Sequence, residues 1–165
     1  MQPMRACGLE QNKGNRFILR KIIPPVYFFT ALLLMTALHR YFPLLHVFTP
    51  PVTYAGIILI IAGICMSAWG ANAFNKAGTP VIPFEQSTTL VTHGLYRYTR
   101  NPMYLGMMII LSGTWIFLGS LSPLFVVSVF FLFIQEVFIK HEEPFLENIF
   151  GDQYKEYKSK VRRWL

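Results

Sequence analysis

Four long apolar runs constrain this chain more than any other feature of its sequence. They cover residues 22–40, 52–74, 102–118 and 123–141. A helix needs about 20 predominantly apolar residues to cross the hydrocarbon of a bilayer. Only 14% of the residues are charged, whereas a typical soluble domain has about 25%. The sequence therefore predicts an all-α membrane protein with about four transmembrane helices, of which the last two are slightly short and continue into polar ends.

The chain divides into a short tail and one domain. Residues 1–21 are basic and are expected to form a cytoplasmic tail, and residues 22–165 are expected to form a single membrane domain. A basic segment before an apolar run is also typical of a signal peptide. Here the basic region is long and no clean small-x-small cleavage site follows it, so we interpret the first run as an uncleaved helix.

The last segment, residues 144–165, is amphipathic. Its apolar residues recur at helical spacing, namely Leu146, Ile149, Phe150, Tyr154, Tyr157, Val161 and Trp164. Gly151 and Asp152 interrupt the pattern, since glycine suits the C′ position of one helix and aspartate the N-cap of the next. The basic opposite face fits a helix lying against anionic headgroups, and an ordinary helix packed on the bundle explains the pattern equally well.

The basic residues fall almost entirely on one side of a four-helix arrangement. Both ends of the chain and the loop 75–100 carry 14 of the 15 Lys and Arg residues, and the connector between the first two runs carries only Arg40. The positive-inside rule then places both termini in the cytoplasm of a multi-pass protein, in a bacterial inner membrane or, in a eukaryote, the endoplasmic reticulum. The net charge of +7 therefore requires no nucleic acid.

The small residues of the second apolar run and the two cysteines also carry predictions. Small residues in the second run, at Gly56, Gly63, Ser67 and Gly70, predict close contact with a neighbouring helix. The two cysteines lie in the basic tail and in an apolar run, so we expect no disulfide. No Cys/His spacing predicts a metal site.

A polar motif occupies residues 93–106, where the loop becomes the third apolar run. Asn101 and Pro102 predict a helix start, since asparagine is a favoured N-cap and proline a favoured first residue. The free amides and positive dipole end of that helix, with His93 and Arg100 beside them, would stabilise an anionic group. Gly106, one turn later, leaves room for a flat group or for a neighbouring helix.

A second polar cluster, Glu142 and Glu143, ends the fourth run. The tight hairpin at residues 119–123 returns this run to the start of the third, so the two clusters are expected to meet. Carboxylates beside a bilayer are costly unless they meet cations or solvent. One can pair with Arg97 or Arg100, and the other can accept from an ammonium group or from ribose hydroxyls. S-adenosylmethionine carries a carboxylate, an ammonium, a ribose and a sulfonium, and satisfies both clusters.

Taken singly, each feature also has a structural explanation. The arginines fit membrane anchors, the tyrosines an interfacial belt, Asn101-Pro102 a plain helix start, the glutamates a solvated junction, and His93 a loop residue without a role. The order and spacing of the features favour the functional interpretation.

The motifs at residues 90–106, 142–146, 150–157 and 161–164 resemble the isoprenylcysteine carboxyl methyltransferase and phospholipid methyltransferase superfamily. The resemblance covers the chain from about residue 77 to the end. It implies an integral-membrane methyltransferase that uses S-adenosylmethionine. The cofactor pocket would lie between the cytoplasmic ends of the last helices and the C-terminal segment.

The resemblance also implies roles for individual residues. The expected cofactor-binding residues are Leu90, Val91, His93, Gly94, Tyr96, Arg100, Asn101, Pro102, Tyr104, Glu142 and Glu143. The expected catalytic residues are Arg100 and Glu142. Glu142 would contact the cofactor directly, whereas Glu143 would support the pocket.

Two positions depart from the family pattern. Asn101 replaces the histidine of an Arg-His-Pro-x-Tyr element, which excludes a titrating base there. Phe138 lies about where prenylcysteine-specific relatives carry an arginine suited to the substrate carboxylate.

Methyl transfer from a sulfonium is an in-line displacement, in which the protein mainly positions and desolvates the reactants. The expected acceptor is lipophilic and enters from the bilayer, and carboxyl methylation of an isoprenylcysteine-like substrate is the first hypothesis. N-methylation of a phospholipid amine and S-methylation of a small thiol are alternatives. A further alternative is a non-catalytic membrane scaffold or a nicotinamide-dependent, reductase-like relative, although the paired glutamates and the lack of a phosphate-binding glycine loop favour the methyl donor. The expected partners are membrane lipids and the prenylated or other lipophilic substrate, with no obligate protein partner.

Overall fold

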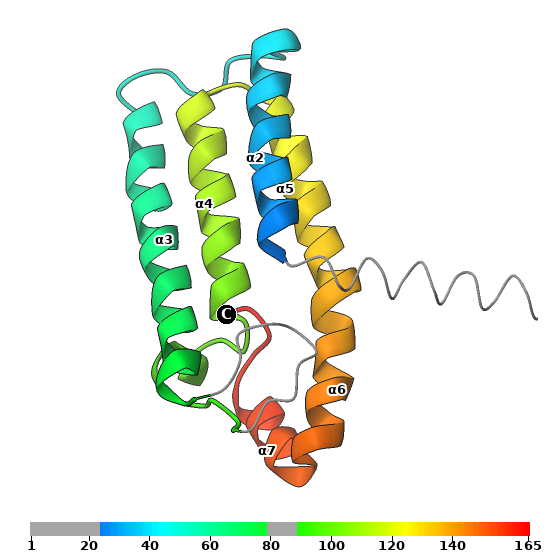
Figure 1. The fold of residues 1–165 in the computed structure, drawn as a ribbon. Coiled ribbons are helices and arrows are strands. Elements are labelled where there is room, and N and C mark those ends of the chain that lie inside the picture. Colours follow the sequence, from blue (N-terminus) through cyan, green and yellow to red (C-terminus); the bar gives the residue numbers. More distant parts are fainter. Residues whose placement is uncertain (1–23, 79–88) are drawn as a thin grey trace, which may run out of the picture.

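The computed structural model describes residues 24–78 and 89–165, so the expected basic tail at residues 1–21 lies outside it. Within the described ranges the chain is all-α apart from an isolated bridge between His46 and Ser120. Four helices lie side by side as a bundle, namely α2 (Pro24–Tyr41), α3 (Thr53–Lys76), α4 (Pro102–Leu118) and α5 (Ser122–Phe133) (Figure 1). The short 3₁₀-helix η1 (Gly94–Arg97) precedes α4. The all-α fold expected from the sequence is therefore confirmed for this part of the chain.

The fourth helix does not stop where its apolar run ends. It continues from α5 through a π-helical stretch, η2 (Ile134–Ile139), into α6 (Lys140–Phe150). Pro144 lies inside α6, so it does not separate the span from the amphipathic segment. The glutamates are thereby carried on the same continuous helix as the apolar run (Figure 1).

Two of the described helices are long and apolar enough to cross a membrane, namely α3 and the continuous helix Ser122–Phe150. The apolar helix α4, with 17 residues, is shorter. Large apolar side chains cover the outside of the bundle, and Leu33, Ile58 and Phe125 are each about 70% exposed (73%, 69% and 71%). A continuous apolar surface of this kind is typical of a surface that contacts lipid.

Helices α3 and α4 touch through a stripe of glycines. A Cβ added at Gly63 would lie 2.6 Å from the carbonyl oxygen of Gly106, and one added at Gly113 would lie 2.6 Å from that of Gly56. The absence of side chains lets the two backbones come into direct contact. The close packing predicted for the second apolar run is confirmed, and the space at Gly106 is filled by α3.

At the opposite end from the polar motifs, α4 and α5 are joined by the expected tight hairpin. Gly119 ends α4 with a φ of 77°, a conformation that favours glycine. Its carbonyl accepts from the backbone N–H groups of Val47 and Phe48, so the connector after α2 is tied to the hairpin. The hairpin sends α5 back alongside α4, toward the end where the chemistry-bearing residues lie.

Candidate functional site

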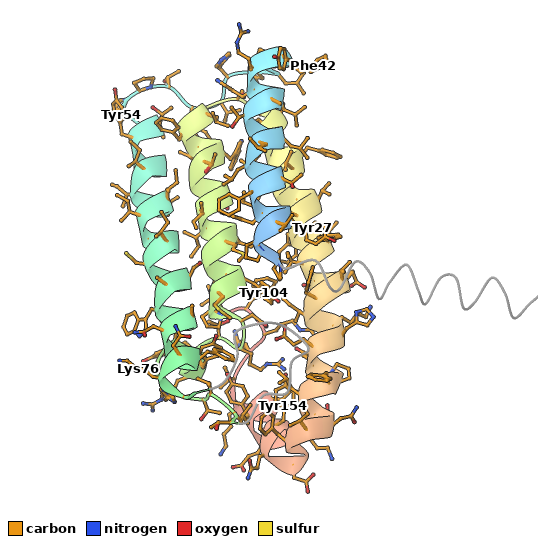
Figure 2. The ribbon with its side chains drawn as sticks, viewed as in Figure 1. Tyr27, Phe42, Tyr54, Lys76, Tyr104 and Tyr154 are labelled. Carbon is orange, nitrogen blue, oxygen red and sulfur yellow. The ribbon has the colours of Figure 1, made fainter. Side chains whose placement is uncertain are left out.

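A cavity of about 430 Å³ lies where α3 ends and α4 begins. The segments that carry the two polar clusters line it, namely the loop before α4 and the helices α6 (Lys140–Phe150) and α7 (Asp152–Lys160). Figure 2 shows Lys76, Tyr104 and Tyr154 at this end of the bundle, whereas Phe42 and Tyr54 lie at the other. The two polar clusters therefore meet at one site.

Most of the expected site residues line this cavity. They are Leu90, Val91, Tyr96, Arg100, Asn101, Tyr104, Glu142 and Glu143. His93 and Gly94 are exposed and lie outside the lining. Pro102 is buried as the first residue of α4 and packs toward α3, where its Cγ lies 3.4 Å from the position of a Cβ on Gly70.

Glu143 is the centre of an ion-pair network. It is 7% exposed. Arg163 donates to it twice, from Nε to Oε1 at 2.8 Å and from Nη2 to Oε2 at 2.7 Å, and Arg100 Nη1 lies 3.0 Å from Oε1. Lys158 is more distant, at 4.0 Å. Because a buried charge is costly unless it is paired and hydrogen-bonded, this carboxylate depends on its two arginines.

Glu142 has different surroundings. The hydroxyl of Tyr104 donates to its Oε2 across 3.4 Å, which is a long hydrogen bond. Among residues 24–78 and 89–165, no cation lies within ion-pair distance of it. Glu142 thus remains the carboxylate available to a cationic ligand group in the cavity.

The last residues of the chain close one side of the site. The backbone N–H of Arg100 donates to the carbonyl oxygen of Arg162 at 3.0 Å, and the Thr99 hydroxyl donates to that of Arg163 at 3.2 Å. The Asn101 amide also donates to the Arg163 carbonyl, at 3.0 Å. We name residues 161–165 the C-terminal strap, which Figure 1 shows running from α7 to the base of α4.

The side chain of Asn101 therefore does not have the role expected of it in the helix. Helix α4 begins at Pro102 as predicted, with Asn101 at the N-cap position, but the Asn101 side chain makes no capping hydrogen bond. Its amide donates to the strap instead. The Asn101 side chain therefore bonds the carbonyl of Arg163, far along the chain, instead of a backbone N–H in the first turn of α4.

The C-terminal segment corrects two further expectations. Asp152 is the first residue of α7 rather than its N-cap, because Gly151, with a φ of 55°, occupies that position. The helix ends at Lys160, and Val161 is extended, so the strap is not helical. The apolar side chains of this segment pack on the protein. Its apolar face forms a cluster of Tyr154, Tyr157 and Val161, against which Leu90, Leu146 and Phe150 pack.

Buried tyrosines line the opposite wall. Tyr157 donates to the carbonyl oxygen of Tyr96 at 2.7 Å and so ties α7 to η1. Burial raises the pKa of both phenols above the usual value, so both hydroxyls stay protonated at neutral pH. They can donate hydrogen bonds there but cannot serve as bases.

Three buried polar atoms of the lining have no hydrogen-bond partner among the described residues, namely the Tyr96 hydroxyl and Nε and Nη1 of Arg100, and of these only Nη1 lies at ion-pair distance from Glu143. Buried polar groups are normally hydrogen-bonded, so such atoms in a cavity wall indicate a ligand. A donor hydroxyl, an arginine and an uncompensated carboxylate match the carboxylate, hydroxyl and cationic groups of S-adenosylmethionine. The residues present therefore fit this cofactor.

Reasoning from sequence missed several of the lining residues. Tyr154 and Tyr157 were seen only as part of the amphipathic pattern and of the 150–157 motif, Ser67 only as a small residue at a helix contact, and Ala68 and Ala71 of α3 only as part of an apolar run. The small side chains of α3 were a usable signal, since they leave space beside α4. Arg163 belongs to the 161–164 motif of the family resemblance, but no local signal showed that its side chain reaches Glu143.

Comparisons with known proteins show which proteins this chain resembles in sequence. The phospholipid methyltransferase family matches residues 52–153. A probable protein-S-isoprenylcysteine O-methyltransferase of Oryza sativa subsp. indica is 35% identical over 119 residues, which are 69% of this chain and 61% of that protein. Protein-S-isoprenylcysteine O-methyltransferase A of Arabidopsis thaliana is 36% identical over 110 residues, 64% of this chain and 55% of that protein.

A solved structure shows the same fold. The eukaryotic intramembrane Ras methyltransferase ICMT (isoprenylcysteine carboxyl methyltransferase) matches with a TM-score of 0.60 at 24% identity, over 89% of this chain and 50% of that chain. Helices and cavity thus define an all-α class of protein with two candidate membrane spans among the described helices. The chain belongs to the phospholipid methyltransferase family. It spans 50–61% of the length of these three relatives.

Proposed function

We propose that this chain is a methyltransferase that uses S-adenosylmethionine to methylate a lipophilic acceptor at the basic face of a membrane. The observation that carries the proposal is the cavity in which, among the residues that the structure describes, Glu142 has no cation partner and the Tyr96 hydroxyl and Arg100 Nε have no hydrogen-bond partner. Family membership supports the same reaction class. The multi-pass arrangement with both termini in the cytoplasm is part of the proposal.

The residues have distinct roles in this account. Glu142 attracts the positively charged end of the cofactor, and Tyr104 orients that carboxylate through its hydroxyl. Arg100, held by Glu143 at 3.0 Å, presents its free Nε to a carboxylate. Tyr96 donates to a ligand hydroxyl or nitrogen. The cofactor supplies an electrophilic methyl group, so the protein contributes binding, orientation and exclusion of water.

Carboxyl methylation of an isoprenylcysteine-like substrate is the first acceptor hypothesis, because the relatives from rice and Arabidopsis carry that activity in their names. Their match leaves about two-fifths of their length uncovered, so the acceptor is tested separately from the cofactor. Apolar residues of the cavity wall, including Met107 and Ile139, suit a lipid-like group.

A lipid amine is the second candidate, and Phe138 favours it. This side chain is fully buried and packs against the rings of Tyr27, Phe133 and Tyr104. It therefore offers nothing to pair with an acceptor carboxylate. An amine would instead be attracted by the uncompensated charge of Glu142.

The test is transfer of a tritiated methyl group by the purified full chain in lipid nanodiscs. The acceptors are an N-acylated prenylcysteine, phosphatidylethanolamine and an alkyl thiol, assayed separately. Label released by mild base from the prenylcysteine supports carboxyl methylation, and label that stays in the lipid headgroup supports the amine. Transfer to none of the three would overturn the proposed reaction and leave the scaffold interpretation.

Glu142→Gln tests the site, with Glu136→Gln as its matched control. Both substitutions remove one carboxylate from the same continuous helix, but Glu136 is exposed and its ion-pair partner in the described part of the chain is Lys140, at 2.8 Å. We expect Glu142→Gln to lose most of the transfer and Glu136→Gln to keep it. Equal activity in the two variants would overturn the role assigned to Glu142.

A further inference from the structure

Arg163 contacts both segments that carry the polar clusters, namely α6 and the loop before α4. It lies ten residues beyond residues 52–153, the region that matches the family. Its side chain reaches Glu143 on α6 through two hydrogen bonds. Its carbonyl oxygen accepts from Thr99 and Asn101, in the loop before α4. One residue of the strap thus contacts the two polar clusters that form the cavity wall.

The two arginines around Glu143 differ in their geometry. Arg163 makes a fork-to-fork contact of 2.8 and 2.7 Å, whereas Arg100 approaches a single oxygen at 3.0 Å. Paired donors of this kind fix the plane of a carboxylate as well as its charge. The orientation of Glu143 is therefore set mainly by Arg163.

The consequence for Glu142 is electrostatic. Adjacent carboxylates on a helix repel one another when both are charged and poorly solvated. With Arg163 in place, the charge of Glu143 is balanced, and Glu142 faces the cavity with Tyr104 as its one hydrogen-bond partner among residues 24–78 and 89–165. Without Arg163, the remaining close cation is Arg100, and its guanidinium would be drawn more strongly to Glu143 and away from a ligand.

We propose that Arg163 is a positioning residue: it holds Glu143 as a structural carboxylate, so that Arg100 Nε and the Glu142 carboxylate can bind the cofactor. This inference rests on the proposed function, because it concerns the same cavity. It adds the C-terminal strap to the machinery of the site. Arg163 itself is absent from the cavity lining and touches no reacting atom.

The experiment is calorimetric titration of the full chain in detergent micelles with S-adenosylhomocysteine. Arg163→Gln is expected to weaken binding about tenfold or more, because hydrogen bonds to a charged group are worth at least that factor. Arg163→Lys keeps the charge but loses the fork, so its affinity should fall between those of Arg163→Gln and the unaltered chain. Arg162→Gln is the matched control, since its side chain is exposed and only its backbone carbonyl is used.

A double substitution separates positioning from simple support of the strap. If Arg163 acts through the charge of Glu143, then adding Arg163→Gln to Glu143→Gln should change the affinity by less than about twofold, because the charge to be balanced is already gone. If the Arg163 side chain instead acted through contacts other than Glu143, Arg163→Gln would cause the same loss in both backgrounds. Equal losses would overturn the inference.

The remaining outcomes are also decisive. An Arg163→Gln variant that binds as tightly as Arg162→Gln overturns the inference while leaving the proposed function intact. No binding by the unaltered, folded chain overturns both. If Arg163→Gln does not fold, Arg163→Lys is compared in the two backgrounds instead, with the same expected contrast.

Discussion

The glycine stripe between α3 and α4 makes a quantitative prediction, because the space at Gly63 is defined by backbone atoms. A Cβ there would lie 2.6 Å from the carbonyl oxygen of Gly106, about 0.8 Å inside the 3.4 Å at which ordinary contact begins. It would also lie 2.9 Å from the backbone nitrogen of Ile110. Neither atom can rotate away, so the helices must separate.

Gly63→Val is the perturbation. Overpacking of this kind costs about 1–3 kcal/mol, and the upper half of that range is expected because the clash is with backbone. The better helix propensity of valine offsets only about 0.3 kcal/mol of this loss. Separation by 0.5–1 Å also weakens neighbouring contacts by about a quarter to a half. A net loss near 2 kcal/mol corresponds to a fall in the unfolding midpoint of roughly 4–8 °C for a chain of this size.

Thermal unfolding in detergent, followed by circular dichroism, measures this loss. Ala62→Val is the matched control, since Ala62 is the preceding residue of α3 and faces outward. Its midpoint should stay within about 2 °C of the unaltered chain, the range expected of surface substitutions. If Gly63→Val and Ala62→Val shift the midpoint equally, the argument from backbone contact is refuted.

Three further predictions concern single contacts. Tyr157→Phe removes the hydroxyl that donates to the Tyr96 carbonyl at 2.7 Å, and the unpaired carbonyl should cost about 1–2 kcal/mol in thermal unfolding; an unchanged midpoint would contradict the burial of this bond. Phe138→Ala empties a fully buried position and should lower the free energy of unfolding by about 3–5 kcal/mol. A thermal midpoint equal to that of the unaltered chain would contradict the close packing of the aromatic cluster around it. Lys140→Ala breaks only an exposed pair with Glu136, so neither stability nor transfer should change measurably, and a clear loss of either would show that solvent screening is weaker than assumed.

The sequence was sufficient for the features that depend on local pattern. Pro102 starts a helix because proline suits the first turn, and the spacing of small residues in α3 identified a contact face. The meeting of the loop before α4 with Glu142 and Glu143 followed from a hairpin too short to do anything but reverse the chain. These inferences required no knowledge of distant partners.

The features that escaped prediction depend on tertiary contacts. Pro144 was expected to start a new segment, yet α6 continues through it, and the π-helical stretch just upstream, in which the N–H of Lys140 donates to the carbonyl of Gln135, was not expected either. Asn101 gives up capping because a strap carbonyl reaches its amide. Trp164 looked like part of a helical stripe but packs on Phe131 and donates to Gln135 from an extended chain. No periodicity encodes such partners.

Cofactor binding tests the central claim most directly. We predict that S-adenosylhomocysteine binds the purified chain at a single site in calorimetric titration. Arg100→Ala, Glu142→Ala and Tyr104→Ala should each weaken that binding, because all three side chains line the cavity and the Glu142 carboxylate has no cation partner among the described residues. Binding that is absent from the unaltered chain, or that is unchanged in all three variants, would contradict the account.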